Sequence, residues 1–173
     1  MLETSRLQLI PLSIVQLELA LNDLPTLARE MGVTIHPDIL DKNVIRALSM
    51  KIGKMRAAAV ESHPWYTYWL IVIREDRAGA GLIGFKGYPD EDGRTEIGYG
   101  IHPSYQNKGY MTEAIRALRD WAFSHPICRG ITATTVINPA SNRVLEKLGA
   151  QLLQQRENET DWLVLPKTDS GVN

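Results

Sequence analysis

The segment from Gln106 to Met111 joins amide and charged side chains to a glycine, directly before a stretch with helical periodicity. At a helix N-terminus several backbone N–H groups lack partners within the helix, and the helix dipole adds partial positive charge. Such an end binds phosphate, and Gly109, which has no Cβ, lets an anion approach the backbone closely. Lys108 adds a direct positive charge. A glycine at a helix start is nevertheless a weak signal, and for Gly109 by itself an ordinary loop is the better interpretation.

The elements around this loop are those that would present it to a ligand. Residues 95–101 form an expected strand that ends just before the loop, and the turn Asp92-Gly93 predicts an antiparallel hairpin with residues 81–88. After the loop, apolar residues recur on one face of a predicted helix, which His125-Pro126 ends. These apolar residues are Met111, Ala114, Ile115, Leu118, Trp121 and Ala122.

Further helical and strand-like patterns fill the rest of the chain. Ser13 to Gln16 has the spacing of a capping box and opens a helix over 14–21, and a second amphipathic helix begins near Asp41. Asn138-Pro139 opens a short helix that Gly149 closes. Strands are expected at 7–12, 66–74 and 131–137, and near 152–153 and 162–165. The strand over 131–137 is almost continuously apolar and β-branched, as expected of a buried parallel strand. This order predicts a mixed α/β fold.

Length and composition limit the class of protein. The 173 residues suffice for a single domain over 1–166, followed by a polar tail over 167–173. A formal net charge of -1 argues against nucleic-acid binding. No apolar run approaches the roughly 20 residues that span a bilayer, so no membrane partner is expected. With no signal-peptide pattern and a single cysteine, Cys128, the chain is expected in the cytoplasm. Its four histidines show no ligand spacing, and no metal is expected.

Several motifs together resemble the GNAT superfamily of acetyl-CoA-dependent N-acetyltransferases. The run Gln106-x-x-Gly109-x-Met111 is similar to its pyrophosphate-binding signature, Gln/Arg-x-x-Gly-x-Gly/Ala. The segments 3–12, 96–99, 109–114 and 138–149 resemble, in the same order, the branch that acetylates the N-terminal amine of ribosomal proteins. The resemblance implies the GNAT fold, a twisted mixed sheet of six or seven strands with helices on both faces. It also implies a homodimer.

One position departs from the family signature. Met111 stands where the signature has glycine or alanine. The Met111 amide can still donate to a phosphate oxygen, and its side chain is expected to point into the core along the apolar face of the helix.

The resemblance further implies that acetyl-CoA, as a co-substrate, lies between the fourth and fifth strands, which splay apart. The backbone of the strand over 95–101 would then pair with the pantetheine arm and place the thioester carbonyl against an N–H donor. The implied binding residues are Tyr99, Gly100, Ile101, Gln106, Asn107, Lys108, Gly109, Tyr110, Met111, Thr112, Asn138 and Ser141.

Direct attack on the thioester requires a neutral amine, so a group must accept a proton. Glu96, on the fourth strand, is the best candidate for this base. A solvent-facing strand glutamate paired with Arg94 is an equally good interpretation, and a chain of waters could replace a side-chain base. The leaving thiolate needs a proton, and Ser141 is the matching acid of this branch. Ser141 could instead help to cap its helix, and Asn138 could be an N-cap, a pantetheine ligand or both.

The acceptor side is less clearly marked. The aromatic segment 63–69 could wall an acceptor pocket, although core packing is the better interpretation because large aromatic residues are mostly buried. Residues 24–42, with His36, form the expected variable acceptor loop. The acidic turn Asp90-Glu91-Asp92 could attract a cationic amine. A peptide N-terminus, a polyamine, an aminoglycoside and a small metabolite amine all remain open as acceptors.

Two other classes compete with the transferase. An acyl-CoA-binding module with little or no catalysis would keep the same loop and lose the base and acid. A dinucleotide-dependent oxidoreductase fits poorly, because no Gly-x-Gly-x-x-Gly follows a first strand and the neighbouring strands are expected to be antiparallel.

Overall fold

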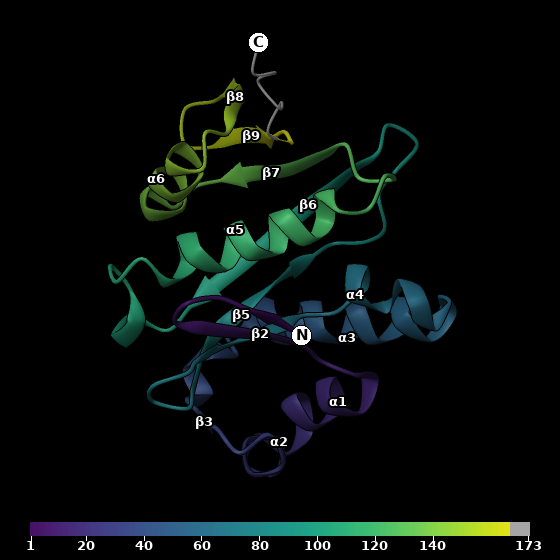
Figure 1. Cartoon of the computed structure of the whole chain (residues 1–173), viewed down its shortest axis with the longest axis vertical. Coiled ribbons are helices and arrows are strands. Elements are labelled where there is room, and N and C mark those ends of the chain that lie inside the picture. The colour runs from purple at the N-terminus through teal and green to yellow at the C-terminus, as the bar shows by residue number, and fades with distance from the viewer. Residues whose placement is uncertain (167–173) are drawn as a thin grey trace.

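The computed structural model describes residues 1–166, so the tail predicted over 167–173 lies outside the described residues. One sheet runs through this part of the chain in the order β1-β2-β4-β5-β6-β7-β9-β8, with β3 beside β5 (Figure 1). The strands are β1 (Leu2–Glu3), β2 (Leu7–Pro11), β3 (Thr34–Ile35), β4 (Trp69–Ile73), β5 (Ala78–Phe85), β6 (Arg94–Ile101), β7 (Gly130–Val136), β8 (Gln151–Gln155) and β9 (Thr160–Val164). Since β1 and β3 have only two residues each, seven longer strands carry the sheet, as expected.

Six α-helices and three short 3-10 helices complete the described part of the chain. The α-helices are α1 (Ile14–Asn22), α2 (Leu24–Met31), α3 (Lys42–Ala57), α4 (His63–Tyr66), α5 (Tyr110–Phe123) and α6 (Pro139–Lys147). The 3-10 helices are η1 (Pro37–Ile39), η2 (Val60–Ser62) and η3 (Pro103–Tyr105). None of the helices within residues 1–166 is long and apolar enough to cross a lipid bilayer.

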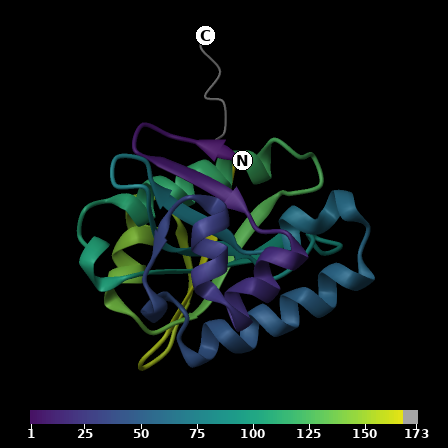
Figure 2. The same cartoon turned by 90° about the horizontal axis from the view of Figure 1, so that it is seen from below.

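Helices cover both faces of the sheet, as predicted. Trp69, Ile71 and Ile73 of β4 pack into the hydrophobic cluster that contains α5, whereas Leu70 and Val72 pack into the cluster that contains α1, α2 and α3. This alternation follows because successive residues of a strand point to opposite faces. In Figure 1 α5 lies in front of the strands, and Figure 2 shows α3 (blue) on the side of the molecule away from β1.

Local sequence signals place most helix ends. The Ser13 hydroxyl accepts from the Gln16 N–H while the Gln16 side chain accepts from the Ser13 N–H, which confirms the predicted capping box. Asp41 caps α3 as expected from the predicted start of that helix. Helix α2 was not predicted, although Asp23 caps its start and Gly32, with φ 63°, ends it.

The strand predicted over 66–74 begins only at Trp69, so its first part was wrong. Residues His63 to Tyr66 form α4, and the Thr67 N–H donates to the His63 carbonyl at 2.9 Å. The indole Nε1 of Trp69 donates to the Pro64 carbonyl at 3.0 Å, and Trp65 is buried in the same hydrophobic cluster as Trp69. Tertiary packing of the aromatic side chains therefore turns this segment into a helical turn.

Strands β6 and β7 meet at one end and part at the other. They pair in parallel, as predicted for β7, from Arg94↔Gly130 to Glu96↔Thr132, and no further. Beyond Glu96, β6 pairs with β5 alone, from Ile97 to Ile101. The edge of β6 that faces β7 is therefore free of a strand partner over these residues, and Figure 1 shows the two strands diverging toward α6. The splayed strands expected from the resemblance are present.

Candidate active site

A cleft of about 300 Å³ opens where β6 and β7 part. Its walls come from the end of β6, the loop before α5, the first turn of α5 and one face of α6. The lining residues are Tyr99, Gly100, Ile101, Tyr105, Gln106, Asn107, Gly109, Tyr110, Met111, Thr112, Asn138, Ala140, Ser141, Arg143, Val144 and Lys147. Of the twelve residues predicted to bind the co-substrate, only Lys108 is not part of this lining.

Helix α5 begins at the cleft without a side-chain cap. Its N-cap residue is Gly109, with φ 81°, and the first intrahelical bond runs from the Glu113 N–H to the Gly109 carbonyl at 3.1 Å. By contrast, a side-chain cap is present on each of the other described helices of eight or more residues, α1, α2, α3 and α6. The uncapped N–H groups at the start of α5 can therefore bind an anion in the cleft.

The loop before α5 is shaped by two residues in the left-handed region. Asn107 has φ 61° and Gly109 has φ 81°, and asparagine and glycine tolerate this conformation best. A Cβ on Gly109 would meet only Nη2 of Arg6, at 3.4 Å, so the backbone there is accessible. The Lys108 ammonium lies 5.6 Å from the centre of the Tyr105 ring. Met111 is buried in the cluster around α5, which confirms the expected direction of its side chain.

Helix α6 brings two predicted residues to the opposite wall. The Asn138 side chain accepts from the Ala140 N–H at 2.8 Å, so Asn138 is the N-cap and lines the cleft as well. Ser141 is not the capping residue. Its carbonyl accepts from the Tyr99 hydroxyl at 3.4 Å, a contact that spans the cleft from β6 to α6. Burial raises the pKa of Tyr99 to about 12, so this hydroxyl keeps its proton at neutral pH.

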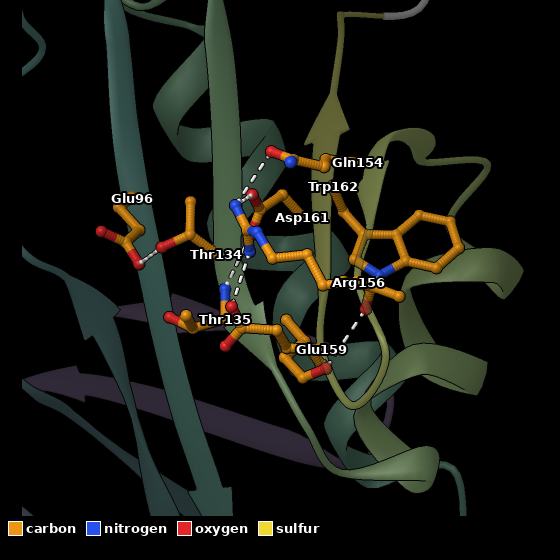
Figure 3. A network of polar contacts seen from close by, with 10 residues as sticks. Glu96, Thr134, Thr135, Gln154, Arg156, Glu159, Asp161 and Trp162 are labelled. Atoms are coloured by element: carbon orange, nitrogen blue, oxygen red, sulfur yellow. Dashed lines mark hydrogen bonds and ion pairs between the residues drawn. The ribbon is translucent and has the colours of Figure 1, made fainter.

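Glu96 lies at the point where the two strands part rather than in the lining of the cleft. Its Oε1 accepts from the Thr134 hydroxyl at 2.5 Å (Figure 3) and from the Lys86 ammonium at 2.6 Å. The ion pair is thus with Lys86 of the neighbouring segment, not with Arg94. Both contacts fall on Oε1, which leaves Oε2 for a proton or a water.

Glu96 shares its face of the sheet with Gly98 and Gly100, and this face is the one opposite to α5. Ile97 packs with the α5 cluster, and residues alternate along a strand. A Cβ on Gly98 or Gly100 would meet no heavy atom within 4 Å. Beside Glu96 the strand is therefore open, and a molecule can approach β6 from this side.

The comparison with known proteins decides the family. The sequence profile described as "Acetyltransferase (GNAT) domain" matches residues 12–151. The chain belongs to the GNAT acetyltransferases. It is 31% identical over 170 residues to the "Uncharacterized N-acetyltransferase YjdG" of Bacillus subtilis (strain 168), covering 96% of this chain and 99% of the other.

Solved structures share the GNAT fold at low identity. The ribosomal L7/L12 alpha-N-protein acetyltransferase RimL, in complex with coenzyme A, superposes with a TM-score of 0.61 at 17% identity, covering 94% of this chain and 95% of the other. The microcin C7 self-immunity acetyltransferase MccE, in complex with acetyl-CoA and AMP, superposes with a TM-score of 0.60 at 15% identity, covering 94% of each chain. The family match supports an acetyl-transferring enzyme, and these solved structures support the GNAT fold.

Four residues of the GNAT cleft were not predicted from the α6 sequence, namely Ala140, Arg143, Val144 and Lys147. These four residues occupy positions i, i+3, i+4 and i+7 along one face of the helix, which is the spacing that brings side chains together. Ser141 precedes Val144 by three positions, so the assignment of Ser141 to the cleft pointed to Val144 and not directly to the other three residues. Arg143 and Lys147 add positive charge to this wall, as an anionic ligand requires.

Two of the dispersed histidines meet in space. The rings of His36 and His102 lie 4.2 Å apart between centroids, and with Asp38 they offer ligand atoms within 4.8 Å of one another. Each Nδ1 accepts a backbone N–H, from Asp38 at 3.2 Å and from Ser104 at 3.3 Å. In the neutral tautomer Nε2 then carries the proton, which opposes metal binding. The absence of a metal stays a prediction.

The aromatic segment before β4 serves the core. Trp65 and Trp69 are buried and pack against Trp121 of α5, with ring centroids 4.7 and 5.2 Å from it. This confirms core packing as the main use of these side chains. Cys128 is buried ahead of β7, as expected for a small apolar residue, and burial raises the pKa of its thiol.

Proposed function

We propose that this protein transfers an acetyl group from acetyl-CoA to a primary amine by direct attack. The observation that carries the proposal is the uncapped N-terminus of α5, which opens into the cleft left by the parting of β6 and β7. A pyrophosphate in the cleft would accept from the free N–H groups of Tyr110, Met111 and Thr112. Arg143 and Lys147 on α6 would balance the remaining phosphate charge.

The free edge of β6 is the second support. Backbone groups of Tyr99, Gly100 and Ile101 line the cleft and have no partner strand on that side within the described residues. An extended pantetheine arm can bind there as an added strand. One N–H of this edge would then donate to the thioester oxygen, where negative charge develops as the amine nitrogen attacks the carbonyl carbon.

The reaction requires a group that accepts a proton and a group that donates one, and Glu96 and Ser141 would fill these two roles. The amine nitrogen forms a bond to the carbonyl carbon, the carbon–sulfur bond breaks, and the amine loses a proton. Glu96 Oε2 would accept that proton directly or through a water, from the open face beside Gly98 and Gly100. Ser141 would donate a proton to the leaving thiolate, and the Tyr99 hydroxyl holds the backbone of Ser141 in place.

The acceptor belongs to the class of primary amines. A peptide N-terminus is the first candidate, because a structural neighbour is named as an alpha-N-protein acetyltransferase. The exposed acidic turn from Asp90 to Asp92 lies at one end of β6 and would attract a cationic amine toward this edge of the sheet. Polyamines, aminoglycosides and small metabolite amines complete the panel. A homodimer and a cytoplasmic location stay predictions.

A thiol-release assay tests the proposal. Purified protein is incubated with acetyl-CoA and each amine, and free CoA is measured with a chromogenic disulfide. Cys128 contributes little background because it is buried. Amine-dependent release of CoA, with a matching acetylated product by mass spectrometry, supports the transferase. Acetyl-CoA binding without turnover over the whole panel would instead favour the acyl-CoA-binding module, and absence of both would contradict the assignment of the cleft.

A further inference from the structure

Strand β7 contains a bulge just beyond the point where it leaves β6. Its pairing with β9 runs through Ala133↔Trp162 and resumes at Val136↔Thr160. Thr134 and Thr135 therefore face a single β9 residue, Asp161, which is the arrangement of a β-bulge. Thr135 has φ 52°, a conformation that a β-branched residue rarely adopts. Another interaction must hold the chain in this shape.

Asp161 supplies that interaction. Its Oδ1 accepts from the Thr135 backbone N–H at 2.8 Å (Figure 3). Its Oδ2 accepts from the Arg156 guanidinium at 2.7 Å, and Arg156 is held in turn by Gln154 at 2.9 Å and by Glu159 at 2.8 Å. The carboxylate is 14% exposed, so water competes little for it. The Thr135 N–H, followed by Arg156, lowers the pKa of Asp161, which is therefore ionised at neutral pH.

The bulge sets the direction of Thr134. The Thr134 hydroxyl donates to Glu96 Oε1 at 2.5 Å across the gap between β7 and β6. Figure 3 shows the line of contacts that runs from Arg156 through Asp161 and the Thr134-Thr135 backbone to Glu96. Strand β9, on the side of β7 away from β6, is thus linked by these contacts to the carboxylate of Glu96, at the point where β6 and β7 part.

The neighbours of Asp161 on β9 hold the other wall of the cleft. Asn142 Oδ1 accepts from the Thr160 hydroxyl at 2.6 Å and from Trp162 Nε1 at 2.8 Å. Asn142 follows Ser141 on α6. Since alternate residues of a strand face opposite sides, β9 fixes the bulge with Asp161 and fixes α6 with Thr160 and Trp162.

We propose that Asp161 is a positioning residue for acetyl transfer, which holds the β7 bulge at Thr135 so that Thr134 fixes the carboxylate of Glu96. The inference rests on the proposed function. Asp161 touches neither co-substrate nor acceptor and acts through Thr135 and Thr134. Loss of its carboxylate should therefore lower kcat, while the affinity for acetyl-CoA, set by α5 and its loop, should change little.

Four variants test the inference on the whole protein. Asp161→Ala removes the acceptor of the Thr135 N–H, and kcat is expected to fall roughly tenfold with the Kd for acetyl-CoA within about twofold of wild type. Asp161→Asn keeps an oxygen for that N–H and should retain most of the activity. Thr135→Gly in the Asp161→Ala background should restore kcat to within about threefold of wild type, because glycine adopts a positive φ without strain.

Glu159→Ala is the matched control. It removes another partner of Arg156 but leaves the bond between Asp161 and Thr135. Its kcat and Kd should equal those of wild type. An unchanged kcat in Asp161→Ala, or a loss of kcat that Thr135→Gly does not restore, would overturn the inference, since a merely structural role predicts no such rescue.

Hydrogen exchange separates this inference from the proposed function. The Thr135 amide should exchange faster in Asp161→Ala than in wild type or Glu159→Ala, whether or not any amine is acetylated. Lack of amine turnover in the wild type would contradict the proposed function alone. Unchanged exchange at Thr135 in Asp161→Ala would overturn the positioning role, because the carboxylate would then not hold the bulge.

Discussion

Arg6 and Glu113 form an ion pair, with Nη2 and Oε2 2.6 Å apart, that ties the N-terminal segment to the first turn of α5. Arg6 Nε also donates to Oε2 at 2.8 Å, while its backbone N–H and the Thr4 hydroxyl donate to Oε1 at 3.1 and 2.6 Å. Arg6 Nη1 donates to the Lys108 carbonyl at 3.0 Å, and the guanidinium lies 4.6 Å from the centre of the Tyr110 ring. Through these contacts the N-terminal segment holds the loop that precedes α5 in place.

This contact predicts that Arg6→Ala weakens acetyl-CoA binding. The loop would lose its link to Glu113, and ordering the loop on binding would cost free energy, so the Kd is expected to rise roughly three- to tenfold. Arg74→Ala is the control, because Arg74 donates to the Thr4 carbonyl in the same N-terminal turn but does not reach the loop. Titration calorimetry of both variants with acetyl-CoA checks the prediction. Equal affinities of Arg6→Ala and Arg74→Ala for acetyl-CoA would contradict it.

Low pH should weaken the same contact between Arg6 and Glu113. Burial alone would raise the pKa of Glu113, but hydrogen bonds from Thr4 and Arg6 and the charge of Arg6 hold it below its ordinary value. A lowered carboxyl pKa contributes stability above the unfolded-state pKa, and this stability is lost as pH falls through the folded-state pKa. Below about pH 4, the range in which an ordinary carboxyl group becomes protonated, wild type should lose affinity for acetyl-CoA more steeply than Glu113→Gln. Parallel profiles for the two proteins would exclude this role.

Substitution of Gly109 should abolish binding of the co-substrate. Gly109→Glu places a side chain and a negative charge at the start of α5, where φ is 81°. Gly149→Ala is a matched control for the backbone cost, since Gly149 has φ 73° and lies outside the cleft. Gly109→Glu should show no measurable acetyl-CoA binding, whereas Gly149→Ala should bind within about twofold of wild type. Retained affinity in Gly109→Glu would remove the loop from the site.

Glu96→Gln should alter the pH–rate profile. Amide Oε1 still accepts from Thr134, but the side chain no longer accepts a proton, so turnover should fall most at acidic to neutral pH, where the amine is protonated. Acetyl-CoA affinity should stay the same, because Glu96 lies outside the lining of the cleft. Glu75→Gln, in the exposed turn between β4 and β5, is the control. A pH–rate profile that matches wild type would show that Glu96 is not the base.

Lys51 gives a test of stability against pH. Its ammonium is buried and donates to the carbonyls of Phe85 at 2.6 Å and Tyr66 at 3.0 Å. Burial, with the charges of Lys54 and Lys86, lowers the pKa of Lys51 to about 7. Between about pH 7 and pH 10 the unfolded chain binds a proton that the folded chain has lost, so this residue makes stability rise with pH.

The measurement is denaturant unfolding of wild type and Lys51→Met across this range. The stability of wild type relative to the variant should increase between pH 7 and pH 10, by at most about 1.4 kcal/mol per pH unit for one proton. The difference cancels the contributions of other groups that titrate at alkaline pH. A difference that stays constant over this range would show that Lys51 titrates normally.

Local chemistry explains what could be predicted from the sequence. The capping box of Ser13 and Gln16, the cap at Asn138 and the turn at Gly109 all depend on residues within three positions of one another. Interactions of this kind do not depend on the register of the sheet. Most residues that line the cleft could be predicted because the resemblance to the GNAT family assigns the loop before α5, the end of β6 and the start of α6 to one binding site.

Long-range contacts explain what could not be predicted. Arg6 and Glu113 are 107 residues apart, and their contact depends on how β2 packs beside α5. One of the two interpretations of Glu96 paired it with Arg94 on the same strand. The hairpin register instead places Lys86 opposite, with its N–H donating to the Glu96 carbonyl at 2.8 Å and its ammonium to the carboxylate. The bulge at Thr135 leaves no local signal, because the carboxylate that accepts its N–H belongs to Asp161, 26 residues further along the chain on β9.

Calorimetric titration of the wild-type protein with acetyl-CoA, with desulfo-CoA and NAD as comparisons, tests the central claim most directly. Acetyl-CoA should bind with a Kd in the micromolar range, about −8 kcal/mol. Desulfo-CoA should also bind, because it keeps both the pyrophosphate that α5 would hold and the pantetheine arm that would pair with β6. NAD has a pyrophosphate but no pantetheine arm, so it should not bind. No binding of acetyl-CoA, or equal binding of NAD, would contradict the assignment of the cleft as the site of an acetyl-CoA-dependent transferase.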